Sequence, residues 1–205
     1  MRHDPILKCG VAALLLVAGT HIAGAEKPGA QEYNAQLSGF AEIGALNNNS
    51  GAILTNGSGQ LTLTIEQGVA QYSLIFSGLT SNITQAHLHF GQKHVAGGIF
   101  VWLCTNLGNG PPGTQACPPI AKSGTVSGII GPSNIVAVTG QNIVAGDFNA
   151  LLAALAFDTA YVNVHTVNFA AGEIRGQVEL REKDKDQGKG EDQGKGKEQG
   201  KGRGQ

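Results

Sequence analysis

The sequence predicts an all-β domain, a sandwich or barrel of about eight short strands, followed by a tail that does not fold. Three observations support this. Between 33 and 180, apolar residues alternate with small polar ones. Glycine is frequent, with 31 residues in 205, while charged residues make up only 14% of the chain. After Leu180 the apolar residues stop altogether. A region of this length is long enough for one domain with its own core.

The beginning of the chain has the pattern of a secretory signal peptide. The apolar run VAALLLVAG (11–19) precedes Ala23-Gly24-Ala25, which fits a cleavage site and predicts a signal peptide over 1–25 and a linker over 26–32. A membrane anchor is the weaker alternative, because spanning a bilayer takes about 20 apolar residues. The sequence therefore predicts a secreted or periplasmic protein without a transmembrane segment after signal cleavage.

The stretch 59–79 gives the strongest strand pattern. Leu61, Leu63 and Ile65 alternate with threonines, and apolar residues return at every second position from Tyr72 to Phe76. Glu66-Gln67-Gly68 separates the two runs, so we expect a β-hairpin with one face in the core. The other predicted strands are 33–43, 85–90, 98–104, 123–130, 160–166 and 172–180.

One segment has helical spacing instead. In 146–157 the apolar residues are Phe148, Leu151, Leu152 and Leu155, and Asp147 precedes them in the position of an N-cap. We expect a short helix across one end of the sandwich, with its Leu and Phe side chains in the core.

Cys104 and Cys117 are the thiols that would remain after signal cleavage, which removes Cys9. They bracket a loop rich in Gly and Pro, and paired cysteines are the usual state in exported proteins. We predict a disulfide, worth about 3 kcal/mol in the chain-entropy model.

Residues 181–205 form a tail in which Gln-Gly-Lys-Gly recurs at 187, 193 and 199. Without apolar side chains it cannot offset the entropy of ordering, so we predict disorder. It carries eight basic and six acidic residues. This weak charge favours a solvated spacer over a nucleic-acid-binding arm, and we expect no nucleic-acid partner.

Several of these stretches together resemble the CHRD domain, named from chordin. The resemblance covers nearly all of 33–180 and rests on LSGFAEI (37–43), FSGLT (76–80), AHLHFG (86–91), AYVNVHT (160–166) and GEIRGQ (172–177). The chain departs from the family at two turns, where Gly44-Ala45 and Ala171 stand in place of prolines. The resemblance implies an immunoglobulin-like or superoxide-dismutase-like Greek-key β-sandwich with one short helix. It implies no established biochemical activity.

Three histidines lie in two of the predicted strands. Side chains at i and i+2 of a strand share a face, so His87 and His89 point the same way, and His165 points with Asn163 and Tyr161. If the strands are neighbours, three imidazoles meet, and such a set suits Cu(II) or Zn(II). Ligand nitrogens within about 4 Å of one another would favour a metal site.

The alternative is structural, with the histidines hydrogen-bonded to the backbone or to Glu173. The His-x-His pair, with Gly172 and Arg175 at Gly-x-x-Arg spacing, also resembles superoxide dismutase strands. The long His- and Asp-rich loop that holds zinc in those enzymes is not found here. His94 falls in a Gly-rich turn and is expected to be exposed.

Arg175 is one of four basic residues between 26 and 180. Its spacing places it on the same strand face as Glu173. We expect a structural role, in which Arg175 pairs with Glu173 or caps carbonyls of the 146–157 helix. The alternative is an arginine that steers an anion or substrate toward the histidines.

No complete catalytic set can be assembled from the chain. The sequence therefore favours a non-catalytic binding or structural module without a cofactor, whose unknown partner is an extracytoplasmic protein or glycan. The alternative is a copper-binding or superoxide-handling protein that uses His87, His89 and His165 with Arg175.

Overall fold

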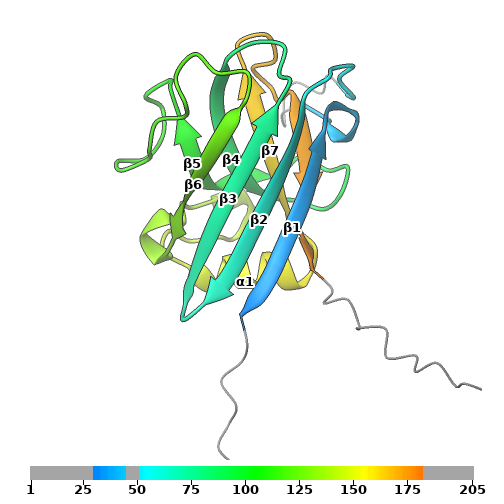
Figure 1. The fold of residues 1–205 in the computed structure, drawn as a ribbon. Helices are drawn as coiled ribbons and strands as arrows, with labels where there is room; N and C mark the ends of the chain where they lie inside the picture. Colours follow the sequence, from blue (N-terminus) through cyan, green and yellow to red (C-terminus); the bar gives the residue numbers. More distant parts are fainter. Residues whose placement is uncertain (1–29, 45–50, 182–205) are drawn as a thin grey trace, which may run out of the picture.

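The computed structural model describes residues 30–44 and 51–181, and Figure 1 shows their fold. The signal peptide predicted for 1–25, and all but the first residue of the tail predicted for 181–205, lie outside these residues. The first strand begins at Gln31, so the last two residues of the predicted linker belong to the sheet. None of the helices in the described part is long and apolar enough to cross a membrane.

Nine strands of the described residues form one antiparallel sheet in the order β5-β4-β7-β8-β1-β2-β3-β6, with β9 also paired to β1. In Figure 1, β1, β2, β3 and β6 form the front layer and β4, β5 and β7 the layer behind. The all-β prediction is confirmed. The strands are β1 (Gln31–Ser38), β2 (Ser58–Glu66), β3 (Val69–Ser77), β4 (Ile83–Phe90), β5 (Gly98–Thr105), β6 (Gly124–Ile130), β7 (Ala160–Thr166), β8 (Ile174–Gln177) and β9 (Glu179–Leu180).

The predicted hairpin is confirmed as β2 and β3. Glu66 pairs with Val69, so Gln67 and Gly68 form a two-residue turn, and both have positive φ angles (51° and 80°). Such a turn matches the twist of the strands that it joins. In the same register Leu61 lies opposite Leu74, and both side chains are buried in the core.

The sheet differs from a sandwich of two separate sheets, because it nearly closes on itself. Ser38 of β1 pairs with Arg175 of β8, which joins the two layers on one side. On the other side Gln115 donates from Nε2 to carbonyl oxygens of both edge strands, Leu103 of β5 at 3.0 Å and Ser127 of β6 at 3.2 Å. The finer Greek-key designation stays a prediction.

The predicted disulfide is confirmed, and it lies at the same seam. It joins Cys104 of β5 to Cys117, in the loop that leads to β6. Both cysteines are buried. The bond therefore fixes a Gly- and Pro-rich loop to the edge of the sheet.

The predicted helix is also confirmed, as α1 (Phe148–Ala156). The Asp147 side chain accepts a hydrogen bond from the Ala150 amide at 3.2 Å, as an N-cap does. Phe148, Leu151 and Leu155 face the core, whereas Leu152 is only partly buried. Three short 3-10 helices complete the described elements: η1 (Gly39–Ala41), η2 (Pro132–Asn134) and η3 (Thr139–Gln141).

Strand β7 is buried on both faces over its whole length. One face, with Val162 and Val164, packs into the hydrophobic core. The opposite face carries Tyr161, Asn163 and His165, so it holds polar groups that are also withdrawn from solvent. Buried polar groups require partners, and the arrangement on this face therefore decides the chemistry of the domain.

Candidate metal centre

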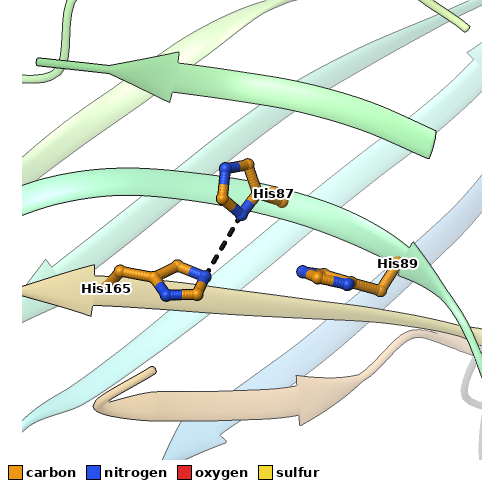
Figure 2. A group of neighbouring side chains, drawn as sticks. All are labelled: His87, His89 and His165. Atoms are coloured by element: carbon orange, nitrogen blue, oxygen red, sulfur yellow. Dashed lines mark hydrogen bonds between the residues drawn. The ribbon is translucent and has the colours of Figure 1, made fainter. Parts of the chain in front are cut away.

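The structure brings His87, His89 and His165 together, as Figure 2 shows. β4 and β7 are hydrogen-bonded neighbours, and their register places His87 opposite Asn163 and His89 opposite Tyr161. One ring nitrogen from each histidine lies within 4.8 Å of the other two. Nδ1 of His87 is 3.2 Å from Nε2 of His165.

All three imidazoles are buried, with exposed fractions of 0% for His87, 8% for His89 and 6% for His165. Burial disfavours the charged form of a histidine. It lowers the pKa of His89 and of His165 to about 4. Burial, and then the neighbouring histidines, also lower the pKa of His87. The rings are therefore neutral at pH 7, which is the form that binds metals.

His89 has an oxygen atom at each of its two nitrogens. Nδ1 lies 2.9 Å from the carbonyl oxygen of Gly97, and Nε2 lies 3.0 Å from Oδ1 of Asn163. The first contact depends on glycine, because a Cβ at position 97 would overlap the carbonyl group of Phe90. Gly97 thus lets the 91–97 loop fold back over β4 and cover His89.

His165 has the same arrangement. Its Nδ1 lies 2.9 Å from the carbonyl oxygen of Ala170, and its Nε2 lies 3.0 Å from Oδ1 of Asn163. The carbonyl group of Ala170 belongs to the 167–173 segment between β7 and β8. Each of these two rings is therefore held from outside by a backbone carbonyl, while its other nitrogen points to one shared amide oxygen.

These contacts leave each ring one proton short. A neutral imidazole carries a single N–H, so it can donate to only one of two oxygen acceptors. If the Nδ1–H groups of His89 and His165 donate to the backbone carbonyls, both Nε2 lone pairs face Oδ1 of Asn163. Lone pairs from three atoms then converge on one place. In addition, Nε2 of His87 is buried without a hydrogen-bond partner.

Glu42, which follows η1, is the carboxyl group next to this cluster. Its Oε1 accepts hydrogen bonds from the backbone amides of Ile43 at 3.0 Å and Gly44 at 3.1 Å. Burial raises the pKa of Glu42, while these amides, Arg175 and the Asn163 side chain lower it. The Asn163 interaction falls outside hydrogen-bond geometry, and Oε2 of Glu42 has no partner. The direction of its effect nevertheless places the amide NH₂ of Asn163 on the Glu42 side.

Gly172 forms the wall behind Glu42. Its φ is 126°, and a Cβ at this position would overlap Oε2 of Glu42. Sequence reasoning did not select Glu42 as a site residue. The family opening LSGFAEI, in which it is the acidic residue, was the signal that pointed to it.

The predicted pairing of Arg175 with Glu173 is wrong, and so is capping of the 146–157 helix. The Arg175 guanidinium donates to the carbonyl oxygens of Gln92 at 3.1 Å and Val95 at 3.0 Å. Its Cζ lies 3.4 Å from the centre of the Tyr161 ring, and Tyr161 also stacks on His89 at 4.7 Å. Arg175 thus holds the 91–97 loop over the histidines, and its Nη1 is buried without a partner.

Glu173 lies outside the cluster because β8 begins only at Ile174, so the two-residue strand period does not extend to it. Its carboxylate accepts hydrogen bonds from the hydroxyls of Thr55, Thr80 and Thr166 at 2.7 to 2.9 Å, and from the Thr80 amide at 2.8 Å. It therefore joins three segments of the chain, and none of its contacts is to a histidine. His94 is exposed, as predicted.

The CHRD domain family model matches residues 33–178 of the chain. The chain belongs to the CHRD domain family. No curated protein and no solved structure matches it. The matched residues of this CHRD domain include all three histidines, Asn163, Glu42 and Arg175.

Trp102, on β5, completes the CHRD cluster on its outer side. It lies opposite His87 in the register, and its ring meets the His87 ring edge to face at 4.3 Å. It is partly exposed and also lines a surface pocket with Tyr72, Pro111 and Gln115. His87 therefore lies directly beneath the one aromatic side chain that separates it from this pocket.

The donor atoms fit a transition metal in kind and nearly in spacing. Two nitrogens bound to one ion at 2.0–2.1 Å can be at most about 4.2 Å apart. The three ligand atoms span up to 4.8 Å, which is also wider than the 4 Å expected of a metal site. Binding therefore requires the rings to close by about half an ångström, a change that small side-chain rotations provide.

Proposed function

We propose that this CHRD domain is a binding module whose ligand is one transition-metal ion, held by His87, His89 and His165. The proton shortage of the cluster carries the proposal. His89 and His165 each face oxygen atoms at both nitrogens, and a cation among the two Nε2 atoms and the Asn163 oxygen removes the repulsion between their lone pairs.

The alternative, purely structural role requires the cluster to be satisfied without an ion. A protonated imidazolium would supply the second N–H on each ring, but burial lowers the pKa of both rings to about 4. Rotation of the Asn163 amide would supply two N–H groups, but it would turn the amide oxygen toward Glu42. The metal-binding role agrees better with both groups.

Copper and zinc are the candidate ions, because imidazole ligands suit both. Cu(II) is favoured, since a given site of nitrogen and oxygen donors binds it more tightly than Zn(II). Backbone carbonyls that accept the Nδ1–H groups of metal-binding histidines fix the ring tautomer and orientation. Gly97 and Ala170 are placed to do this for His89 and His165.

A non-catalytic role is favoured over superoxide chemistry. The ligands are buried, and Arg175 is already engaged with the carbonyls of Gln92 and Val95 instead of facing an open channel. A secreted or periplasmic location is part of the proposal and is supported by the Cys104–Cys117 disulfide. A superoxide assay on the copper-loaded protein tests the alternative, for which activity above that of free Cu(II) would be required.

The deciding experiment is a calorimetric titration of the chelator-stripped protein with Cu(II) at pH 7.5. We expect one equivalent to bind, and His89→Ala to abolish this binding. The matched control is a triple variant, His3→Ala, His21→Ala and His94→Ala, which removes every other histidine of the chain and should bind one equivalent as before.

Stability gives a second measurement that does not depend on heat of binding. Free Cu(II) at 100 times its dissociation constant should stabilise the folded protein by about 2.7 kcal/mol. No binding to the stripped protein, or binding that survives in His89→Ala and is lost in the triple control, would refute the proposal.

A further inference from the structure

Asn163 lies at the centre of the histidine cluster. Its Oδ1 is 3.0 Å from Nε2 of His89 and 3.0 Å from Nε2 of His165. The residue belongs to β7, lies opposite His87 in the register, and is 3% exposed. Neither the family match nor the sequence pattern assigns it a role.

The spacing around Asn163 corresponds to neighbouring ligands of one metal ion. Donor atoms at 2.0–2.2 Å from an ion lie about 2.9–3.1 Å apart at right angles, and about 3.3–3.6 Å apart in a tetrahedron. The two Oδ1–Nε2 distances are 3.0 Å, and Nδ1 of His87 is 3.2 Å from Nε2 of His165. These values are closer to right angles, and tetragonal sites of nitrogen and oxygen ligands are typical of Cu(II).

The orientation of the amide is fixed by its surroundings. The NH₂ group lies on the side of Glu42, whose carboxyl group is held by the amides of Ile43 and Gly44 and confined by Gly172. Reversing the Asn163 amide would place Oδ1 against that carboxyl group. The oxygen is therefore directed at the histidines, as a ligand atom must be.

We propose that Asn163 is the fourth metal ligand of the site, binding through Oδ1, and that Glu42 is the positioning residue that holds this oxygen toward the ion. The inference rests on the proposed metal-binding function and deepens it, because it defines a set of three nitrogens and one oxygen. Such a set suits Cu(II) better than Cu(I), for which soft sulfur ligands are preferred.

The first test is Asn163→Leu, which keeps the approximate size of the side chain and removes the oxygen. The three histidines should still bind one equivalent of Cu(II), but the affinity should fall at least 10-fold, the size of effect seen when groups around a metal are lost. The electron paramagnetic resonance spectrum of the bound Cu(II) should also change, because one coordinated oxygen is lost. Unchanged affinity and spectrum would overturn the proposal.

A second variant is needed because leucine could impair folding at a buried polar position. Asn163→Asp retains an oxygen at the same place and adds a negative charge, so it should raise the Cu(II) affinity at least 10-fold and shift the same spectrum. Equal affinity and an identical spectrum in Asn163→Asp would also overturn the ligand assignment.

Glu42→Gln tests the positioning role without altering a ligand. A neutral amide at position 42 can hydrogen-bond either end of the Asn163 amide, so the oxygen is no longer directed at the ion. We expect weaker Cu(II) binding with the wild-type stoichiometry, and wild-type affinity would refute this role. If the wild-type protein itself binds no copper, the histidine proposal fails as well. If it binds copper and the Asn163 variants behave as wild type, only the fourth ligand is refuted.

Discussion

The metal-free domain should lose stability as the pH falls from 6.5 toward 4, because three neutral histidines are buried together. In the unfolded chain a histidine takes up a proton near pH 6.5. In the folded protein the pKa of His89 and of His165 is lowered to about 4, and that of His87 is also lowered. The unfolded state therefore binds more protons in this range, so the free energy of unfolding rises with pH.

The magnitude follows from the two values. A shift from 6.5 to about 4 corresponds to about 3 kcal/mol for each of the two rings, fully present above pH 6.5 and lost on approaching pH 4. Glu42 acts in the opposite direction, because its raised pKa makes the folded state take up a proton first. Arg175 and Tyr161 also face the cluster, and both stay protonated throughout this range.

Urea unfolding with a chelator present, measured between pH 6.5 and 5, isolates the histidines, because unperturbed carboxyl groups titrate lower. We expect a loss of about 1.4 kcal/mol per pH unit for each histidine that titrates. His89→Gln, whose amide can still donate to Gly97, should reduce the slope by one proton, whereas His94→Ala should leave it unchanged. A flat profile across this range would show that the rings are not buried in the neutral form.

Three further predictions concern the fold around the site. Phe76→Ala should destabilise the domain by about 3–5 kcal/mol in a denaturant melt, because the ring is 1% exposed in the core; a loss below about 1 kcal/mol would contradict this packing. Replacing Cys104 and Cys117 together by alanine should cost about 3 kcal/mol, since the bond closes a loop with a sequence separation of 13, and reduction of the wild type should reproduce that loss. Gly97→Ala should weaken copper binding as well as stability, because the new Cβ overlaps the Phe90 carbonyl and displaces the carbonyl that orients His89; a variant with wild-type affinity and melting temperature would show that the loop adapts.

Local patterns in the sequence determined the elements that carry the site. The hairpin followed from a two-residue period interrupted by Gln67-Gly68, and the helix from apolar spacing after Asp147. The shared face of His87 and His89 followed from the geometry of a strand. Each of these depends on neighbours along the chain, so the residues themselves specify it.

Only the tertiary structure decided what surrounds the histidines. The closing of the sheet depends on long-range pairing between β1 and β8, and the strand period could not show that Glu173 precedes β8 and contacts threonines from other segments. Asn163 could be placed on the histidine face, but its contacts depend on the backbone path of the loops that bring Gly97 and Ala170 to the rings. Glu42 reaches the cluster from the other end of the domain sequence. These contacts join segments about 70 to 130 residues apart, and no local periodicity encodes such distances, because they are fixed by the packing of the whole chain.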